Sequence, residues 1–505
     1  MRRFRVTRYL CGVKGWLGDY LLRLPWALFY WNARKSWYRL RGRRGQCPCH
    51  NPSDSGEPMR TGCEAMMTWH RPARFRRVCP LLRQNESGQW MCSVAAAEVR
   101  PFWGRAALLT GGTATALLLA LLLAVFGLMR GIGYEVSFRQ IAWPPAWGEL
   151  RYVRAQLFIK QARDFYAQGE VRDALAALTV ARELDRNNYP VAMMLAQFYQ
   201  AGNPEMADRL YAELLRDHPD HRVETARVWF RSLLARGQLA GVAELARRQL
   251  KHEPPQASAW AHALIFSARV MRRPEVLDEA LADKDTPAVV RPTLELAARV
   301  QRAAPEEARQ LLMAPGLTAL PYDRVYRIES LTRRGHPEEA MQLLRIARPQ
   351  LAGRDVARLA FAIYAKAGER ERLAQEFDAL LATARALTAG EISLLAIHLI
   401  EYPDPRLLAQ LVAALERLPT EPVAARLEAG LAVFCAAGVQ ADREAMTAAK
   451  NAISATVDMR LPAINKLELF FLGLSEQRRI VSFLPQQSAL SLELNYALLD
   501  RYLSN

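Results

Sequence analysis

The sequence predicts an all-α protein in which a single transmembrane helix joins a basic, cysteine-rich N-terminal segment to a long array of helical hairpins. Three observations predict this class. Residues 106–129 contain no charged side chain, glycines recur at intervals of 33 to 35 residues beyond residue 165, and the chain there shows helical spacing almost without strand signals. The predicted parts are a basic aromatic amphipathic segment (1–45), a cysteine-rich segment (46–105), the transmembrane helix (106–129), a linker (130–150) and the repeat domain (151–505).

Positive charge and cysteine are both concentrated at the N-terminal end. The 505 residues carry a net charge of +17, and residues 1–105 hold 20 Lys+Arg against 6 Asp+Glu, whereas the rest of the chain holds 48 against 45. Six of the seven cysteines lie in the same N-terminal part, and Cys435 lies beyond it. A basic, thiol-rich head and a nearly neutral body suggest two different compartments.

Residues 1–45 interleave aromatic rings with arginine. The stretch "GWLGDYLLRLPWALFYWNARKSWYRLRGRRG" holds four tryptophans and three tyrosines. Aromatic rings favour the headgroup region and arginine favours anionic lipid, so the segment is interpreted as an amphipathic element at a membrane surface, interrupted at Pro25. Two alternatives stay open, an aromatic mini-core packed with the cysteine segment and nucleic-acid binding. No nucleic-acid module is visible, and no nucleic-acid partner is expected.

Residues 46–105 contain the candidate metal site. Four thiolates or imidazoles can surround Zn²⁺ tetrahedrally and hold together a segment that is too small to build its own core. The predicted ligands of zinc are Cys47, Cys49, Cys63 and Cys79, with Cys92 and His50 as substitutes. The spacing is not the paired C-x-x-C of a zinc ribbon, so three alternatives stay open: cysteines packed as small hydrophobic side chains, an iron–sulfur cluster, and redox-active thiols.

Residues 106–129 are long enough to cross a membrane. A helix of 24 residues rises about 36 Å, which exceeds the ~30 Å hydrocarbon core, and Trp103, Trp143 and Trp147 suit its two interfaces. Residues 71–105 hold seven arginines, whereas residues 130–150 hold two. Because Lys and Arg resist translocation, we expect the N-terminus in the cytoplasm and the repeat domain on the other side of the membrane.

Beyond residue 150 the sequence repeats a helix–glycine–helix pattern. The clearest copies are "YAQGEVRDALAALTVARELDRNN" (166–188), "YQAGNPEMADRLYAELLRDHPD" (199–220) and "LARGQLAGVAELARRQLKHEP" (234–254). The turn glycines are Gly169, Gly202, Gly237, Gly335 and Gly368. Such a period predicts hairpins that bury their apolar faces against their neighbours. Residues 256–320 and 390–455 keep the helical periodicity without a clear turn glycine, and residues 460–505 fit no unit cleanly.

This pattern resembles the tetratricopeptide repeat (TPR) family, whose unit is a helix–turn–helix of about 34 residues. The resemblance is carried by the turn glycines, by Ala174, Ala207 and Ala340 five residues after a turn glycine, and by Pro219 and Pro254 at closing turns. It implies a right-handed TPR-like α-solenoid of eight to ten hairpins whose concave groove binds protein partners. It also implies a single-pass scaffold in a bacterial inner membrane, with a periplasmic repeat domain, in envelope assembly, secretion or polysaccharide export.

No catalytic motif is visible, so we expect a binding protein and not an enzyme. The carboxylate pairs Glu306–Glu307 and Glu338–Glu339 are expected to begin helices, where negative charge complements the helix dipole. The double arginines at 247–248, 272–273 and 333–334 are expected to be solvated, with an acidic ligand as the alternative. A second function stays open, a membrane signalling or regulatory protein whose cysteine segment senses metal or redox state.

Overall fold

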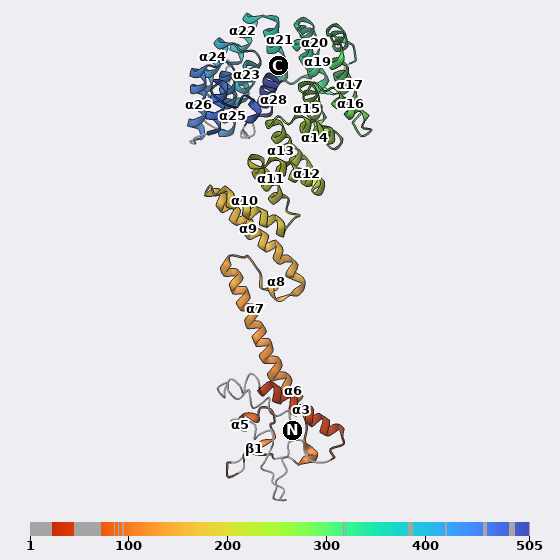
Figure 1. Ribbon diagram of the computed structural model, residues 1–505, viewed down its shortest axis with the longest axis vertical. Coiled ribbons are helices and arrows are strands. Elements are labelled where there is room, and N and C mark those ends of the chain that lie inside the picture. Colours follow the sequence, from red (N-terminus) through yellow and green to blue (C-terminus); the bar gives the residue numbers. More distant parts are fainter. Residues whose placement is uncertain are drawn as a thin grey trace. The chain divides into compact units, whose positions relative to one another are not determined.

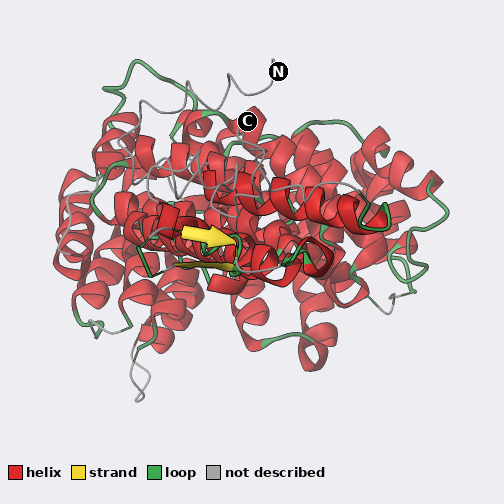
Figure 2. Cartoon of the chain, turned by 90° about the horizontal axis from the view of Figure 1, so that it is seen from below, coloured by secondary structure: helices red, strands yellow, loops and turns green. Residues whose placement is uncertain are grey.

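The chain divides into two compact units, residues 1–160 and 161–505, and each is described by itself. The computed structural model describes residues 23–44, 72–84, 86–88, 90–92, 95–316, 318, 320–381, 387–419, 422–457, 462–483 and 490–503. Helices make up most of these residues, and one pair of short strands is the exception (Figures 1 and 2). The all-α class predicted from the sequence is therefore confirmed.

In the first unit, helix α3 packs on the cysteine-containing segment. Its Leu28 and Trp31 share an apolar core with Phe75 and Cys79. The elements of this part are α3 (Leu24–Leu40), α5 (Pro72–Phe75), the antiparallel strands β1 (Leu82–Gln84) and β2 (Trp90–Cys92), and the 3-10 turn η4 (Ala96–Glu98). The opposite face of α3 leaves large side chains exposed, namely Trp26, Phe29, Trp37 and Leu40. Helix α3 thus combines a packed mini-core with an exposed aromatic face.

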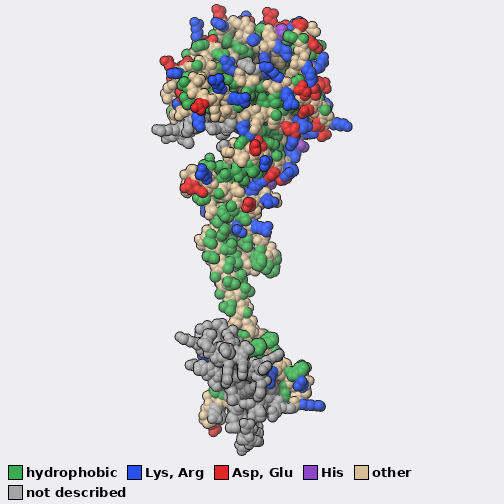
Figure 3. All heavy atoms as spheres, in the orientation of Figure 1, with side chains coloured by type: hydrophobic (Ala, Val, Ile, Leu, Met, Phe, Trp, Pro, Cys, Tyr) green, Lys and Arg blue, Asp and Glu red, His purple; other side chains and the backbone are tan. Residues whose placement is uncertain are grey.

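The apolar segment forms one helix from Trp103 to Ile132. It consists of α6 (Trp103–Ala106), a π-helical turn η5 (Ala107–Gly111) and α7 (Gly112–Ile132). In the part of the chain that the structure describes, it is the one helix that is long and apolar enough to cross a membrane. Most of its leucines are exposed to the surroundings, as the hydrophobic surface over α7 in Figure 3 shows. An apolar surface this large requires a cover other than water.

A short segment after α7 folds back along the helix. Its elements are α8 (Phe138–Ala142), which begins with a Ser137–Gln140 capping box, the 3-10 turn η6 (Pro144–Gly148) and α9 (Glu149–Ala167). Val136 and Ile141 are buried against Phe126 and other apolar side chains of α7. The tryptophans Trp143 and Trp147 stay exposed beside this contact.

The second unit is a succession of helices joined by short connections. They are α10 (Val171–Leu184), α11 (Tyr189–Gly202), α12 (Pro204–Asp217), α13 (Arg222–Ala235), α14 (Leu239–His252), α15 (Ala257–Val270), α16 (Glu275–Ala282), α17 (Arg291–Arg302), α18 (Pro305–Met313), α19 (Pro321–Arg333), α20 (Pro337–Ala347), α21 (Gly353–Ala367), α22 (Arg370–Leu381), α23 (Ala389–Glu401), α24 (Pro405–Glu416), α25 (Val423–Val439), α26 (Arg443–Val457), α27 (Pro462–Phe471) and α28 (Leu492–Leu503). From α11 to α26, each odd-numbered helix packs against the even-numbered helix that follows it. Short 3-10 turns, η7 (Pro219–His221), η8 (Pro254–Gln256), η9 (Arg348–Gln350) and η10 (Ile480–Ser482), occur between helices.

Four of the five predicted turn glycines lie between the helices of a pair and have a left-handed backbone. Their φ angles are +80° at Gly169, +63° at Gly237, +86° at Gly335 and +75° at Gly368. Gly202 instead ends helix α11. At Gly237 the requirement for glycine is twofold, because a Cβ atom would also collide with Val481 from the C-terminal part of the chain.

Two further turns keep this geometry without glycine. Arg272, between α15 and α16, has a φ of +55°, and Ala441, between α25 and α26, has a φ of +53°. A left-handed backbone costs such residues roughly 1–2 kcal/mol, so the surrounding helix packing must hold it in place. The three small residues Ala174, Ala207 and Ala340 are fully buried, as close packing of neighbouring helices requires.

Among the odd-numbered helices, which come first in each pair, some are buried on all sides. Every residue from Ile392 to Ile400 in α23 and from Ala429 to Gly438 in α25 is buried. A helix of this kind needs neighbours on each face. The C-terminal helix α28 supplies part of this cover for α23, because it lies within the second unit and contacts both α13 and α23 (Figure 1).

Candidate functional site

Three of the four predicted zinc ligands, Cys47, Cys49 and Cys63, lie outside the described residues. The fourth, Cys79, is buried, and its Sγ accepts a hydrogen bond of 3.0 Å from the Nζ of Lys35, which is itself 1% exposed. Among the residues that the structure describes, no group of three or more His, Cys, Asp or Glu side chains is placed to hold a metal ion. The zinc site therefore stays a prediction.

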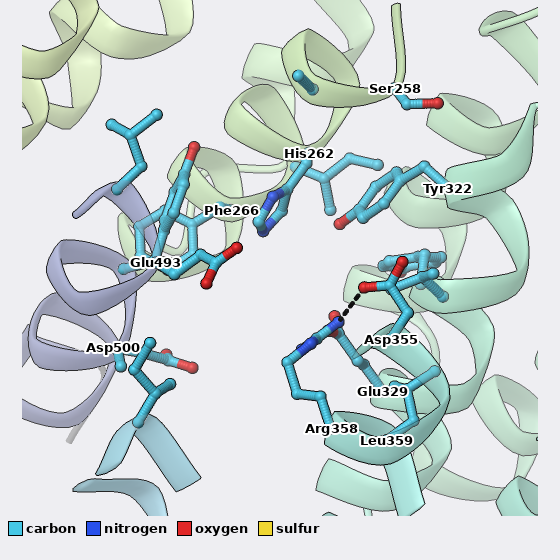
Figure 4. A pocket seen from close by; sticks show the side chains of 18 of the residues that line it. Ser258, His262, Phe266, Tyr322, Glu329, Asp355, Arg358, Leu359, Glu493 and Asp500 are labelled. Atoms are coloured by element: carbon cyan, nitrogen blue, oxygen red, sulfur yellow. Dashed lines mark hydrogen bonds and ion pairs between the residues drawn. The ribbon is translucent and has the colours of Figure 1, made fainter. Parts of the chain in front are cut away.

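A large cavity lies in the second unit and has a volume of about 1350 Å³. It is lined by α13, α15, α19, α21 and α23, each the first helix of its pair, and by α28. Figure 4 shows side chains from three sides of it: Ser258, His262 and Phe266 from α15, Tyr322, Glu329, Asp355, Arg358 and Leu359 from α19 and α21, and Glu493 and Asp500 from α28. Pockets for small ligands usually measure 300–1,000 Å³, so this cavity accepts a larger ligand.

One wall of the cavity is a cluster of aromatic rings. The ring centroids of His262 and Tyr496 are 4.6 Å apart, those of His262 and Tyr322 are 5.1 Å apart, and Phe266 meets Tyr496 edge-on at 4.6 Å. Burial lowers the pKa of His262 to about 4, so its imidazole is neutral at pH 7. The rings therefore form an uncharged wall that joins α15, α19 and α28.

Ion pairs hold the facing charges of the cavity. Arg269 donates a hydrogen bond of 2.7 Å from Nη1 to Oδ1 of Asp500, and Arg333 lies 3.7 Å from the other oxygen of that carboxylate. On the other side Arg358 pairs with Glu329. Burial is the largest influence on the pKa of Glu329 and raises it, but the neighbouring positive charges, Arg358 foremost, together outweigh burial and lower that pKa. Glu329 and Asp500 are therefore both paired with arginines in the cavity wall.

Glu401, the last residue of α23, differs from the other acidic groups near it. It lines the cavity and makes no hydrogen bond or ion pair with any residue that the structure describes. Its side chain is exposed. The surrounding protein displaces water from Glu401 and raises its pKa. The charges of Arg333 and Arg358 offset part of that rise. The carboxylate thus lines the cavity, is influenced by the charges of two arginines, and accepts no hydrogen bond from a described residue.

Comparison with protein-family models, with curated proteins and with solved structures finds no match for this chain. The site is therefore interpreted from its own residues.

The structure places the other residues singled out in the sequence as follows. The pairs Glu306–Glu307 and Glu338–Glu339 lie in the first turns of α18 and α20, as expected. Arg247 and Arg248 both pair with Glu244 on the outer helix α14. Arg272 and Arg333, from the other two double arginines, line the cavity instead.

Most residues of the cavity carry no signal in the sequence. His262, Tyr322, Glu401 and Tyr496 come from four helices that are far apart in the chain, so no local motif contains them. One signal was present. His398 and Glu401 are polar residues three positions apart at the end of the apolar run "ISLLAIHLIE", and this spacing puts both on one face of a helix.

Proposed function

We propose that this chain is a single-pass membrane protein whose helical repeat unit, similar to TPR domains, holds a segment of a partner protein in the cavity. The observation that carries the proposal is the composition of the cavity wall, where rings and ion pairs from five first helices and α28 face one cavity. Stacked helical hairpins present such a surface rigidly, because each helix is fixed by its neighbours. A polypeptide segment is the class of partner that such surfaces receive.

The helix from Trp103 to Ile132 is proposed as the membrane anchor. The arginines before it support a cytoplasmic N-terminus, and the repeat unit then lies on the periplasmic side of a bacterial inner membrane. The proposed role is that of a scaffold in envelope assembly, secretion or polysaccharide export, in which the membrane anchor keeps the bound partner close to the bilayer.

The contacts of the cavity residues support a binding role. Glu329 and Asp500 are both engaged by arginines, which supports a structural role for these two carboxylates. His262 is neutral and packed between rings.

Site-directed photo-crosslinking in native membranes tests this proposal. A benzophenone amino acid replaces Lys366, an exposed residue that lines the cavity, and in the matched control it replaces Ile346, an exposed apolar residue on α20 that does not. We expect a discrete protein adduct from position 366 and none from position 346. Ala362→Trp, which puts an indole ring into the cavity, is expected to abolish the adduct. No adduct, equal adducts at both positions, or an adduct that survives Ala362→Trp would overturn the proposal.

A further inference from the structure

One face of helix α3 is exposed and carries no charge. Trp26, Phe29, Ala33, Trp37 and Leu40 are exposed and recur every three or four residues, so they share one side of the helix. The four large side chains among them are between 58% and 80% exposed. The opposite side of α3 is buried in the mini-core of the first unit. An apolar face of this size requires a cover other than water.

Hydrogen bonds fix α3 to the start of the apolar helix. Asn32 is fully buried, and its Oδ1 accepts a hydrogen bond of 2.7 Å from the backbone N–H of Phe102, while its Nδ2 donates to the carbonyl of Phe102 at 3.4 Å. One turn later, Oγ of Ser36 accepts a hydrogen bond of 2.9 Å from Nε1 of Trp103. The Phe29 ring meets the Trp103 ring edge-on, with centroids 5.3 Å apart. Helix α3 is therefore held beside α6, at the level where the apolar helix begins (Figure 1).

Aromatic rings at the other end of the apolar helix indicate that Trp103 lies at a membrane interface. There Phe126 meets Phe138 of α8 edge-on, with centroids 6.0 Å apart, and Trp143 and Trp147 are exposed nearby. Twenty-three residues separate Trp103 from Phe126, which is about 35 Å at ~1.5 Å per residue. This length is close to the ~30 Å hydrocarbon core, whose two edges tryptophan prefers. A bilayer with one edge near Phe126 has its other edge near Trp103, and therefore at α3.

The C-terminal end of α3 and the turn after it are strongly basic. Arg39, Arg41, Arg43 and Arg44 are exposed, and none of them forms an ion pair with a residue that the structure describes. The guanidinium carbon of Arg41 lies 4.8 Å from the centroid of the Trp37 ring, so positive charge borders the apolar face. Arginines beside an apolar helix face at the headgroup level attract anionic lipid.

We propose that the face of α3 formed by Trp26, Phe29, Ala33, Trp37 and Leu40 inserts into the headgroup region of an anionic phospholipid bilayer, where the arginines at positions 39 to 44 bind lipid phosphates. This inference rests on the proposed membrane anchor and adds a second contact with the bilayer, one that selects a lipid class. Because α3 is fixed to Phe102 and Trp103, its insertion also sets the depth of the anchor in the membrane.

The test is photo-crosslinking of the full chain in lipid nanodiscs that contain equal amounts of phosphatidylglycerol and phosphatidylcholine. A benzophenone amino acid replaces Trp37 on α3, Leu118 on α7 or Ile346 on α20, which are 58%, 56% and 58% exposed. Since the three exposures match, a difference between the positions reports what surrounds each one. After irradiation, mass spectrometry counts the lipid adducts. We expect lipid adducts at positions 37 and 118 and none above background at position 346.

The three positions separate failure of this inference from failure of the anchor. Adducts at position 118 without adducts at position 37 overturn the inference and leave the anchor intact. Crosslinks from position 37 to another part of the chain also overturn it, since protein then covers the face. Absence of lipid adducts at position 118 removes the anchor, and the inference with it. Benzophenone at Leu40, which is 80% exposed on the same face, repeats the measurement independently of Trp37.

The ratio of phosphatidylglycerol to phosphatidylcholine adducts tests the role of the arginines. We expect an excess of phosphatidylglycerol of about threefold or more at position 37 and no excess at position 118. The variant Arg39→Gln/Arg41→Gln/Arg44→Gln should lower that excess to less than about half, and Arg43 is kept because its backbone is left-handed.

A matched control makes the same change in net charge at another place. It replaces with glutamine three exposed arginines of α9, namely Arg151, Arg154 and Arg163. This control should leave the excess at position 37 unchanged. Equal lipid ratios at positions 37 and 118, an excess that survives the α3 variant, or an equal loss in the α9 control would overturn the binding of anionic lipid by α3.

Discussion

Removal of the Asp323 carboxylate should loosen the helix that carries much of the cavity wall. Asp323 lies in the first turn of α19 and is fully buried, and its Oδ2 accepts a hydrogen bond of 2.9 Å from Nε of Arg327, one turn later. Thr293 of α17 donates to the other oxygen at 3.1 Å. Arg327 also donates to the carbonyl of Leu312, at the end of α18, at 2.9 Å. The Asp323–Arg327 pair therefore ties α17 and α18 to α19.

The expected cost follows from what Arg327 keeps and loses in Asp323→Ala. Loss of one partner of a buried ion pair costs about 3–5 kcal/mol, because a buried charge is left without its counter-charge. Arg327 keeps two backbone acceptors, the carbonyls of Leu312 and Ala314, so we expect the lower end, about 3 kcal/mol. Since 1.4 kcal/mol corresponds to a factor of ten, the opening equilibrium of α19 should rise about a hundredfold.

Hydrogen–deuterium exchange of the full chain measures this opening directly, and it does not require the helical array to unfold in one step. We expect the amides of α19 to exchange about a hundred times faster in Asp323→Ala than in wild type. Asp278→Ala breaks an exposed pair with Arg302 on the neighbouring helices and should leave this rate nearly unchanged. The double variant Asp323→Ala/Arg327→Met should recover most of the protection. Unchanged exchange in Asp323→Ala would refute the reasoning.

Three further predictions concern pH, topology and metal. Burial lowers the pKa of His398 to about 4, from about 6.5 in the unfolded chain. Between these two pH values the unfolded chain binds more protons than the folded chain. The free energy of unfolding therefore falls as the pH falls from about 6.5 to about 4. The free energy of unfolding of His398→Phe should therefore drop less between pH 7 and pH 5 than that of wild type, and an equal drop would contradict this. Alkaline phosphatase fused after residue 505 should be active in bacteria and a fusion at residue 1 inactive; the reverse pattern would exclude the proposed orientation. Elemental analysis of the purified chain should find one zinc per molecule that is lost in Cys47→Ser/Cys49→Ser, and a metal-free wild type would remove the zinc hypothesis.

The helical architecture could be predicted from the sequence because its signals are local. A turn glycine followed by an amphipathic stretch identifies a hairpin from about 20 adjacent residues, and Gly237, Gly335 and Gly368 all lie in the expected turns. The repeat pattern is harder to see in the sequence where a residue other than glycine has the left-handed turn conformation. Arg272 and Ala441 have left-handed φ angles that their residue types do not indicate, since packing of the flanking helices imposes them.

The cavity could not be predicted because it depends on distant parts of the chain. Arg269 and Asp500 pair across 231 residues, and sequence spacing says nothing about such a contact. Residues 460–505, which fit no repeat unit, contain the helix α28 that completes the cavity. Arg333 and Arg334 are both exposed, as expected, but the sequence did not indicate that Arg333 lines the cavity or that Arg334 donates to the carbonyl of Val300.

Helix α28 also limits what the cavity can hold. Its Leu494, Leu498 and Leu499 are fully buried, and exposure of each leucine costs roughly 1.5–3 kcal/mol, or about 5–9 kcal/mol for the three. A ligand that displaced the helix would have to supply that free energy in addition to its own binding. A partner is therefore expected to enter beside α28 and to occupy the existing space of about 1350 Å³. That volume suits a short polypeptide segment and excludes a folded domain, so recognition depends on a few groups of the segment.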